Sequence, residues 1–503
     1  MDNIELDPSA PQPGDQPLLP VTTAAPAAAA LLPTRADARR SGAPAKFVTG
    51  SLLRHILVMA GTGAAGLMAI FVGDLANLIF LSWLNDESII AAVGYGSSIL
   101  FLTVSIGIGL SIAAISLVAP AIGARQMVKA RRLSAHAHLA TLVVSLVLSL
   151  AVWLAIPSSL HLLGATGRTF DLASSYLTIL VPSMAPLALG ITSAGVLRSV
   201  GDARRAMNVT LTGAVINIIL DPILIFGLGL GLEGAAIASV AARFGVMAVG
   251  LYGVIGVHHL MGPPRLKMLR ADLVPLTAVA VPAILTNIAT PFSNAYVTAA
   301  ISHYGDSAVA GWTTIGRVMP VAFGAIYALS GSIGPILGQN FGAGETARMR
   351  EAFTLALKVS AGFTLAAWLL LAILAGPIAT SLHATPEAAA LIALFCRVLS
   401  PLFVFMGALF IANAAFNTLG RATTSTALNW GRATLGTIPF VTAGGAMGGA
   451  GGALAGHMLG GITFGLLAVW LCYRMMDEIA ARQETTIGAF RADANTSPPE
   501  RGE

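Results

Sequence analysis

The stretch VINIILDPILIF, residues 215–226, carries an amide and an acid inside an otherwise apolar run. Asn217 and Asp221 are four residues apart, so in a helix they share one face. Pro222 follows directly, and proline disfavours helical backbone at the residue before it. A carboxylate inside a hydrocarbon layer is costly unless it is paired or protonated. The stretch therefore indicates a membrane-spanning helix whose acid has a function.

The composition of the whole chain supports a membrane environment. Of its 503 residues, 56% are hydrophobic and only 10% are charged, and the mean hydropathy is +0.80. A soluble domain carries about 25% charged residues, so this chain has too few to cover a water-facing surface. Its basic residues do not interleave with aromatic ones, so we expect no nucleic-acid partner. Cys396 and Cys472 lie in apolar runs and are interpreted as packing residues.

Twelve apolar segments of helical length predict an all-α polytopic membrane protein with twelve transmembrane helices. Most exceed the roughly 20 residues that cross a bilayer, so we expect several to be tilted or to extend beyond it. The segments are 52–84, 88–120, 130–157, 169–198, 205–228, 233–258, 272–302, 306–340, 348–379, 387–419, 423–446 and 451–475.

Basic residues gather in alternate loops, with Arg168 as the exception. Because cytoplasmic loops carry the excess of Lys and Arg, this alternation predicts that both termini are cytoplasmic. The Ala and Gly content favours a bacterial inner membrane. Residues 1–48 contain no secretory signal and are predicted to be a disordered cytosolic tail. Residues 479–503 are interpreted as a second cytosolic tail.

The two halves of the sequence repeat. Gly123 and Gly342 end similar segments 219 residues apart, and Gly201 and Gly420 have the same separation. Each repeat holds an even number of spans, so the copies are parallel and related by an axis along the membrane normal. This predicts two six-helix lobes with pseudo-two-fold symmetry. We place the N-lobe at 49–263 and the C-lobe at 264–478.

Polar residues of the first half converge at one depth. At 1.5 Å per residue, Asp221 lies about 24 Å along the fifth segment, in the outer half of the membrane. Ser239 returns to a similar depth in the sixth segment, and the first segment brings Asp74 and Asn77 there. We expect Asp74, Asn77, Asn217, Asp221 and Ser239 to form one cation-coupling pocket.

The chemistry of this pocket suits a cation. We expect no basic residue at that depth in the first half, and two adjacent carboxylates without a cation cannot both ionise. The pair would hold H+ or Na+, and no other cofactor is expected. For Na+, the metal ligands would be Asp74, Asn217, Asp221 and Ser239. Alternatively, Asp221 is a backbone-bonded cap before Pro222, which leaves Asp74 unexplained.

At these residues the sequence resembles a known family. NIILDPILIFGLGLGLEGAAIAS (217–239), preceded by LRSVGDARRAMN (197–208), is similar to the multidrug and toxic compound extrusion (MATE) family, in particular its DNA-damage-inducible protein F branch. FLSWLNDESIIAAVGYGSS (80–98) agrees with it, as do IGAR and FGAG after the second and eighth segments. The resemblance covers about residues 50–475. It implies a twelve-helix, two-lobe exporter of amphipathic compounds that is coupled to a cation.

The resemblance also assigns roles and shows departures. It implies that a first-helix Asp acts together with Asn217, Asp221 and Ser239. The family's Asp position falls on Asn77, while Asp74 stands one turn earlier. The family's proline in the first helix is missing, and Gly61, Gly63 and Gly66 stand there instead.

The second half offers basic candidates for a substrate cleft. The resemblance implies a second acidic site on the seventh and tenth helices, but we expect no acid in 272–302 or 388–419, so coupling is assigned to the first half. Arg317 and Arg397 are expected either to line the cleft or to bond kinked backbone near Pro320 and Pro401. The other cleft candidates, each alternatively a packing residue, are His457, Tyr95, Phe101, Trp312, Phe323 and Tyr327.

These features predict a secondary active antiporter rather than an enzyme. It would export small amphipathic organic compounds in exchange for H+ or Na+, as a monomer in the lipid bilayer. One alternative is a lipid-linked oligosaccharide flippase, which needs a strongly cationic cleft, or an exporter of a specific metabolite. A remote alternative is an intramembrane enzyme, which needs a catalytic motif such as HExxH or GxGD. The cargo, its charge and the coupling ion stay open at this point.

Overall fold

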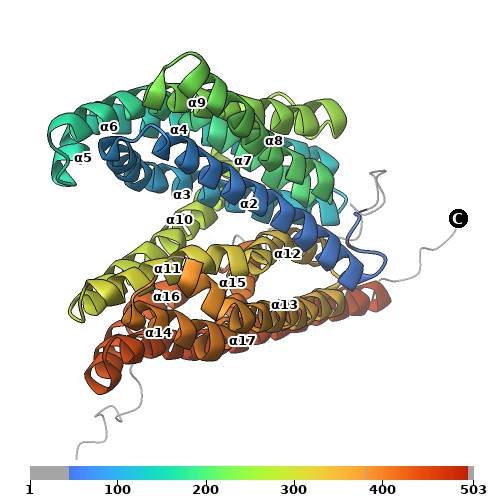
Figure 1. Cartoon of the computed structure of the whole chain (residues 1–503). Helices are drawn as coiled ribbons and strands as arrows, with labels where there is room; N and C mark the ends of the chain where they lie inside the picture. The colour runs from blue at the N-terminus through green and yellow to red at the C-terminus, as the bar shows by residue number, and fades with distance from the viewer. Residues whose placement is uncertain (1–44, 382, 497–503) are drawn as a thin grey trace, which may run out of the picture.

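The computed structural model describes residues 45–381 and 383–496, and within that range the chain forms helices and no strand (Figure 1). The first half contains α2 (Leu52–Ser82), α3 (Glu87–Gly123), α4 (Met127–Leu154), α5 (Ile156–Leu162), α6 (Gly167–Leu180), α7 (Met184–Ser199), α8 (Ala203–Pro222) and α9 (Gly231–Leu251). The second half contains α10 (Leu266–Ser302), α11 (Asp306–Ala322), α12 (Gly324–Ala343), α13 (Thr346–Ser381), α14 (Pro386–Leu394), α15 (Phe403–Thr418), α16 (Ala422–Ala433) and α17 (Ile438–Thr496). Irregular helical turns continue several of them, at Val181–Ser183, Ile223–Gly227, Tyr252–Val257, Phe395–Leu399 and Ser400–Leu402.

The described helices cross the membrane twelve times. Ten are long and apolar enough to span, and α11 and α12 together make one further pass bent by 50°. The apolar run 422–485 is one of the ten but makes two passes, because the backbone of α17 is not helical at Gly448 and Gly449. The segments before and after these glycines run antiparallel, since Gly444 contacts Gly452, and Gly436, just before α17, contacts Gly460. The predicted twelve-helix fold is therefore confirmed.

Two bundles form the molecule, with α2 to α9 in one and α10 to α17 in the other (Figure 1). The link between them, residues 258–265, contains the predicted lobe boundary at 263/264, which stays a prediction. Residues 1–44 of the predicted N-terminal tail and residues 497–503 lie outside the described residues. The helix α17 continues through Thr496, so an unstructured segment does not begin at residue 479.

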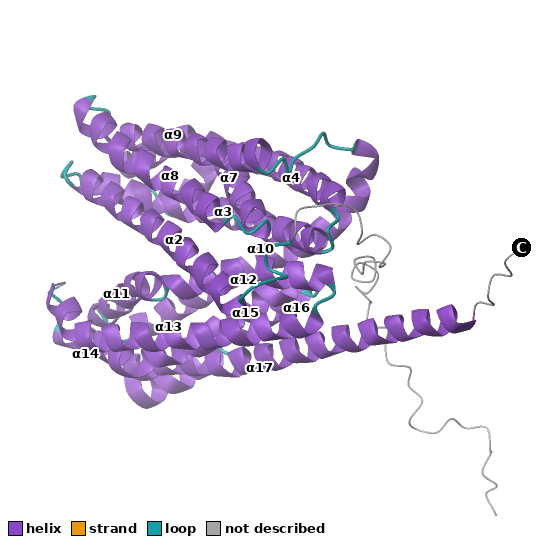
Figure 2. Cartoon of the chain, turned by 90° about the vertical axis from the view of Figure 1, so that its right-hand side faces the viewer, coloured by secondary structure: helices purple, strands orange, loops and turns teal. Residues whose placement is uncertain are grey.

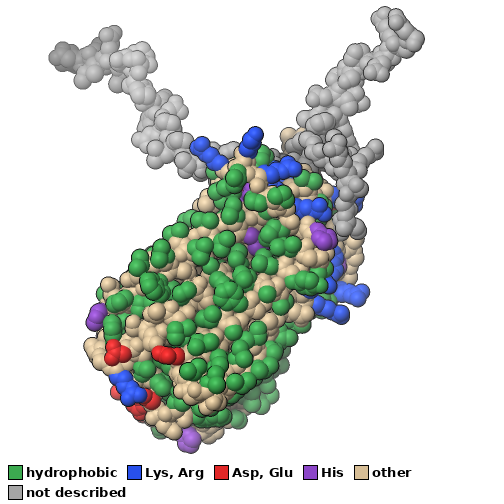
Figure 3. All heavy atoms as spheres, turned by 90° about the horizontal axis from the view of Figure 1, so that it is seen from above, with side chains coloured by type: hydrophobic (Ala, Val, Ile, Leu, Met, Phe, Trp, Pro, Cys, Tyr) green, Lys and Arg blue, Asp and Glu red, His purple; other side chains and the backbone are tan. Residues whose placement is uncertain are grey.

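Charged side chains are separated between the two ends of the molecule. Figure 3 shows most of the visible Lys and Arg side chains at one end, Asp and Glu at the other, and apolar side chains between. We call the first end the basic end; its exposed residues include Arg125, Arg131, Arg204, Lys267, Arg270 and Arg350. Apolar side chains such as Ile373, which is 74% exposed, cover the flank that faces lipid.

The two bundles meet at the basic end and spread apart away from it (Figure 2). A Cβ added to Gly123 of α3 would overlap the backbone of Gln339 in α12, and one added to Gly342 would overlap Pro120. Only glycine permits backbones to approach this closely. Each contact maps onto the other through the 219-residue repeat, so the pseudo-two-fold axis passes between these two helices.

A short segment before α2 closes the same end. Phe47 is only 1% exposed, and its backbone N–H donates to Gln339 Oε1 at 2.9 Å. Gln339 Nε2 in turn donates to the carbonyl of Ser199 in α7 at 2.6 Å. Arg348 donates to the carbonyls of Phe47 and Gly50 at 3.2 and 2.6 Å. Residues 45–48, which the sequence analysis placed in the tail, therefore connect the two bundles.

Gly460 of α17 packs against Gly436, which lies between α16 and α17. A side chain at Gly460 should not fit, because an added Cβ would overlap the carbonyl of Gly436. We expect Gly460→Ala to lower the free energy of unfolding by about 3 kcal/mol through overpacking. The measurement is the apparent melting temperature in detergent, which should fall. Gly461→Ala is the matched control, because its Cβ would meet only the flexible Met406 side chain at 3.3 Å. Equal melting temperatures for the two variants would contradict this packing.

Gln339 should hold the basic end shut. Losing its two buried hydrogen bonds costs roughly 1–3 kcal/mol. Gln339→Ala should therefore increase, about tenfold, the fraction of molecules in which the two bundles are separated at the basic end. Spin labels at the exposed positions of Arg204→Cys and Glu351→Cys would report the separation of the bundles. Gln126→Ala, at the same end but without a capping bond, should leave the distance distribution unchanged. An unchanged distribution in Gln339→Ala would refute the role of this contact.

Candidate functional site

The buried acid of the first half lies at the end of α8. Asp221 is fully buried, and its Oδ2 accepts a hydrogen bond from Asn77 Nδ2 of α2 at 2.9 Å. Its other oxygen, Oδ1, is buried without a partner among the described residues, and so is Oδ1 of Asn217 one turn earlier. After Pro222 the chain widens into the irregular turn Ile223–Gly227, because proline cannot supply a backbone N–H. Two buried oxygens on one helix face are therefore available to a proton or a cation.

The other predicted ligands, Asp74 and Ser239, form no hydrogen bond with Asp221 in the described chain. Asp74, one turn before Asn77 on α2, is exposed, and no hydrogen bond joins it to Asp221. Ser239 is half-buried on α9. Tyr176 of α6 lies within electrostatic range of both Asp74 and Asp221. The structure thus brings Asn77, not Asp74, into contact with the buried acid.

The sequence analysis missed a basic residue beside this region. Arg243 lies one turn beyond Ser239 on α9, and its Nη1 donates to the Leu180 carbonyl and to Ser183 Oγ, both at 2.9 Å. Both acceptors lie at the turn Val181–Ser183, which breaks the fourth pass, and the Leu180 carbonyl also accepts from Ser183 Oγ at 2.6 Å. The expectation that no basic residue stands at this depth in the first half is therefore wrong. The sequence already placed Arg243 one helical turn from Ser239 and therefore close to the same depth.

An acid of the seventh pass was also missed. Asp272 of α10 accepts from Arg132 Nε at 2.8 Å and from Arg132 Nη2 at 3.2 Å, and its Oδ2 lies 2.7 Å from His136 Nδ1. The expectation that this pass carries no acid is wrong. Both partners belong to α4, so this buried group ties α4 to α10 near the basic end and is already paired.

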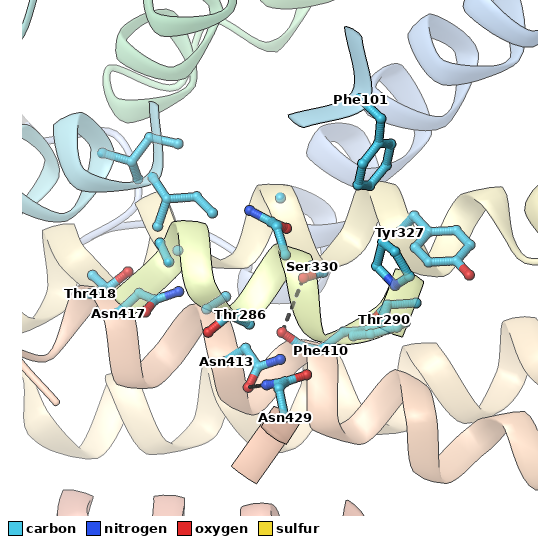
Figure 4. Close-up of a pocket in the computed structure, with 18 of the residues that line it drawn as sticks. Phe101, Thr286, Thr290, Tyr327, Ser330, Phe410, Asn413, Asn417, Thr418 and Asn429 are labelled. Carbon is cyan, nitrogen blue, oxygen red and sulfur yellow. Dashed lines mark hydrogen bonds between the residues drawn. The ribbon is translucent and has the colours of Figure 1, made fainter. Parts of the chain in front are cut away.

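A central cavity of about 420 Å³ lies between the bundles, lined by α3, α10, α12, α15 and α16 (Figure 4). Its size falls in the range of small-molecule sites. Five amides dominate its polar lining, namely Asn287, Asn294, Asn413, Asn417 and Asn429. Asn413 Oδ1 accepts from Asn429 Nδ2 at 2.9 Å, whereas Asn287 Nδ2 and Asn417 Oδ1 are buried without partners in the described chain. None of the described residues that line the cavity is charged.

The sequence signal for this cavity was present but unused. Asn413 and Asn417 are four residues apart, and Asn287 and Asn294 are seven apart, so each pair lies on one helix face. Neutral amides are common on packing faces as well, so this spacing alone does not distinguish a cavity wall from a packed helix face.

Of the predicted cleft residues, Phe101 and Tyr327 line the central cavity, and the others lie elsewhere. Arg317 and Arg397 are exposed, and neither lines the central cavity. Trp312 is buried and donates from Nε1 to Thr298 Oγ1 at 2.9 Å, and His457 packs edge-on against it at 5.9 Å between ring centroids. Tyr95 is half-buried and packs in a core cluster of the first half.

Comparison with known proteins gives one consistent result. The MatE family model matches residues 64–223 and 282–443, one match in each half. The FAD transporter of Shewanella oneidensis is 28% identical over 440 residues, covering 86% of this chain and 97% of that protein. The multidrug export protein MepA of Staphylococcus aureus is 27% identical over 300 residues, covering 58% of this chain and 64% of that protein.

Solved structures agree with this match. A mutant of the Vibrio cholerae MATE transporter VcmN superposes with a TM-score of 0.80 at 25% identity, covering 84% of this chain and 96% of that one. An outward-facing multidrug resistance MATE transporter gives a TM-score of 0.80 at 21% identity, which shows the fold alone, over 88% of this chain and 99% of that one. The twelve-pass fold, the repeat and the family match together show that the chain belongs to the MatE family of membrane transporters and is not an enzyme.

Proposed function

We propose that this protein is an antiporter that exports small organic compounds in exchange for H+ or Na+ bound at Asp221. One observation carries the proposal: a fully buried carboxylate with one oxygen bonded to Asn77 and the other without a partner in the described chain. An unneutralised carboxylate at this depth is costly. A proton on Asp221, or a cation held between Asp221 and Asn217, relieves that cost and makes the site's charge dependent on the ion gradient.

The helix α2 offers a physical link from this acid to the cargo cavity. Toward one end, Asn77 bonds Asp221 of α8. Nearer the other end, a Cβ on Gly63 would lie 3.2 Å from Ala328 of α12, and Met68 packs against Gly324 of the same helix. Since α12 also lines the central cavity, a change at Asp221 that moves α2 alters the cavity wall. The Asp221 site and the central cavity are therefore linked through the packed pair α2 and α12, and coupling requires such a shared element.

The membrane placement is part of the proposal. The basic end faces the cytoplasm because Lys and Arg gather there, so both termini are cytoplasmic, and the membrane is a bacterial inner membrane. The bundles meet at this end, so the described state opens outward. We further propose that the protein acts as a monomer with its lobes at 49–263 and 264–478.

Export of a specific metabolite is the second candidate. Its support is the FAD transporter relative, which aligns over 97% of its own length. A flippase for lipid-linked oligosaccharides has less support, because such a protein needs a strongly cationic cleft and none of the described residues that line the central cavity is charged, with Arg432 lying behind its wall.

Neutralising the buried acid should uncouple transport. We expect the rate of gradient-driven dye efflux from liposomes to fall at least ~10-fold in Asp221→Asn, because an amide cannot exchange a proton or balance a cation. Imposing a pH gradient and a Na+ gradient separately identifies the ion. Asp306→Asn, at an exposed position in the first turn of α11, is the matched control. Undiminished efflux in Asp221→Asn would remove this residue from the mechanism.

Asn77 and Asp74 should contribute unequally. A hydrogen bond to a charged group contributes about 1.5–3 kcal/mol, so Asn77→Leu should lower coupled efflux by at least ~10-fold. Asp74→Asn should lower it less than about threefold, because no hydrogen bond joins Asp74 to the buried acid. The initial efflux rates of the two variants under one gradient measure the difference. The reverse order would assign the first-helix role to Asp74.

A further inference from the structure

We propose that the central cavity binds its cargo through an anionic group, a carboxylate or phosphate, with Arg432 as the counter-charge. The cavity amides would hydrogen-bond the uncharged remainder of the cargo. This inference rests on the proposed export function and names the charge of the compound exported.

Arg432 lies behind the cavity wall. It belongs to α16, is 3% exposed, and its Nη2 donates to Thr290 Oγ1 at 3.2 Å. Thr290 lines the cavity, and so does Tyr327, with which Arg432 interacts electrostatically. The Arg432 Nε is buried without a partner among the described residues. A planar guanidinium with an unused donor is suited to a carboxylate or phosphate.

No acid in the described part of the chain forms an ion pair with this charge. The ion pairs within residues 45–381 and 383–496 do not include Arg432. A buried guanidinium without a counter-charge is costly and, at membrane depth, marks a functional site. Asp221 lies in the other bundle and does not line the cavity, and Asp272 is already paired with Arg132 and His136.

A second guanidinium, that of the half-buried Arg198, lies at a neighbouring cavity. A smaller cavity of about 170 Å³ is lined by Arg198 of α7 and shares Tyr327 and Gly331 with the central cavity. Arg198 Nε is also buried with no partner in the described chain. The described lining of both cavities contains no carboxylate. Each of the two cavities thus has a guanidinium in or behind its wall and no carboxylate in its described lining, which favours an anion over a lipophilic cation.

The remaining lining fits an aromatic, hydrogen-bonding body. Phe101, Tyr327 and Phe410 are among the lining residues (Figure 4), and the Tyr327 and Phe410 ring centroids are 5.4 Å apart. The unpartnered amide atoms of Asn287 and Asn417 offer one donor and one acceptor. An aromatic acid with polar substituents would satisfy both kinds of contact.

Two dyes with one ring system and opposite charge test the proposal. Binding of carboxyfluorescein, an anion, and rhodamine 6G, a cation, would be measured by fluorescence anisotropy on the full-length protein in detergent. We expect the anion to bind at least ~10-fold more tightly. Arg432→Gln should weaken anion binding at least ~10-fold, Arg432→Lys should recover part of it, and Arg265→Gln, at an exposed position before α10, should leave it unchanged.

A second variant guards against misfolding of Arg432→Gln. Asn417→Asp keeps the side-chain volume but adds a carboxylate to the cavity, and it should abolish anion binding and strengthen cation binding. Equal or preferred binding of rhodamine 6G by the wild type, no binding of carboxyfluorescein, or insensitivity to both Arg432→Gln and Asn417→Asp would overturn the inference.

The same dyes in liposomes separate this inference from the proposed function. Gradient-driven export of rhodamine 6G without carboxyfluorescein binding would overturn the anionic site and support the antiporter. Selective anion binding without gradient-driven movement of either dye would support the site and overturn the antiporter.

Discussion

The backbone contact between α3 and α12 is the constraint on which the rest of the structure depends. Gly123 and Gly342 let the two helices touch without intervening side chains, and the same glycines are related by the internal repeat. Because the bundles are pinned at the basic end, they spread only at the other end (Figure 2). The central cavity lies beyond this contact, where the two helices have begun to separate and side chains no longer fill the space between them.

Each bundle holds one fully or nearly fully buried charge that forms no ion pair among the described residues. In the first, Asp221 accepts from an amide, and in the second, Arg432 donates to a hydroxyl. A transported species of opposite charge would relieve the cost of burying each group. An ion and a cargo of opposite sign would then occupy separate sites. The helix α2 contacts both α8 and α12 and is the element through which one site can affect the other.

Much of the fold could be predicted from the sequence, because membrane-spanning helices are set by apolar length and loop charge. The repeat and the depth of Asp221 followed from counting residues. Counting does not give rotation about a helix axis, which decided that Asn77 and not Asp74 contacts the acid. The irregular turn at Val181–Ser183 exposes the acceptors that hold Arg243, and sequence periodicity did not show it. Arg432 lies beside the cavity only because α16 packs against α10.

The glycine contacts between the last two passes have a mechanical consequence. Gly436, Gly444, Gly452 and Gly460 place two backbones in direct contact over several turns, with no side chains that could slide or change rotamer. Such a pair moves as one stiff rod. The other helices of this half are broken at two places, the 50° bend between α11 and α12 and the turns between α14 and α15. Bending at those breaks leaves the glycine contacts intact.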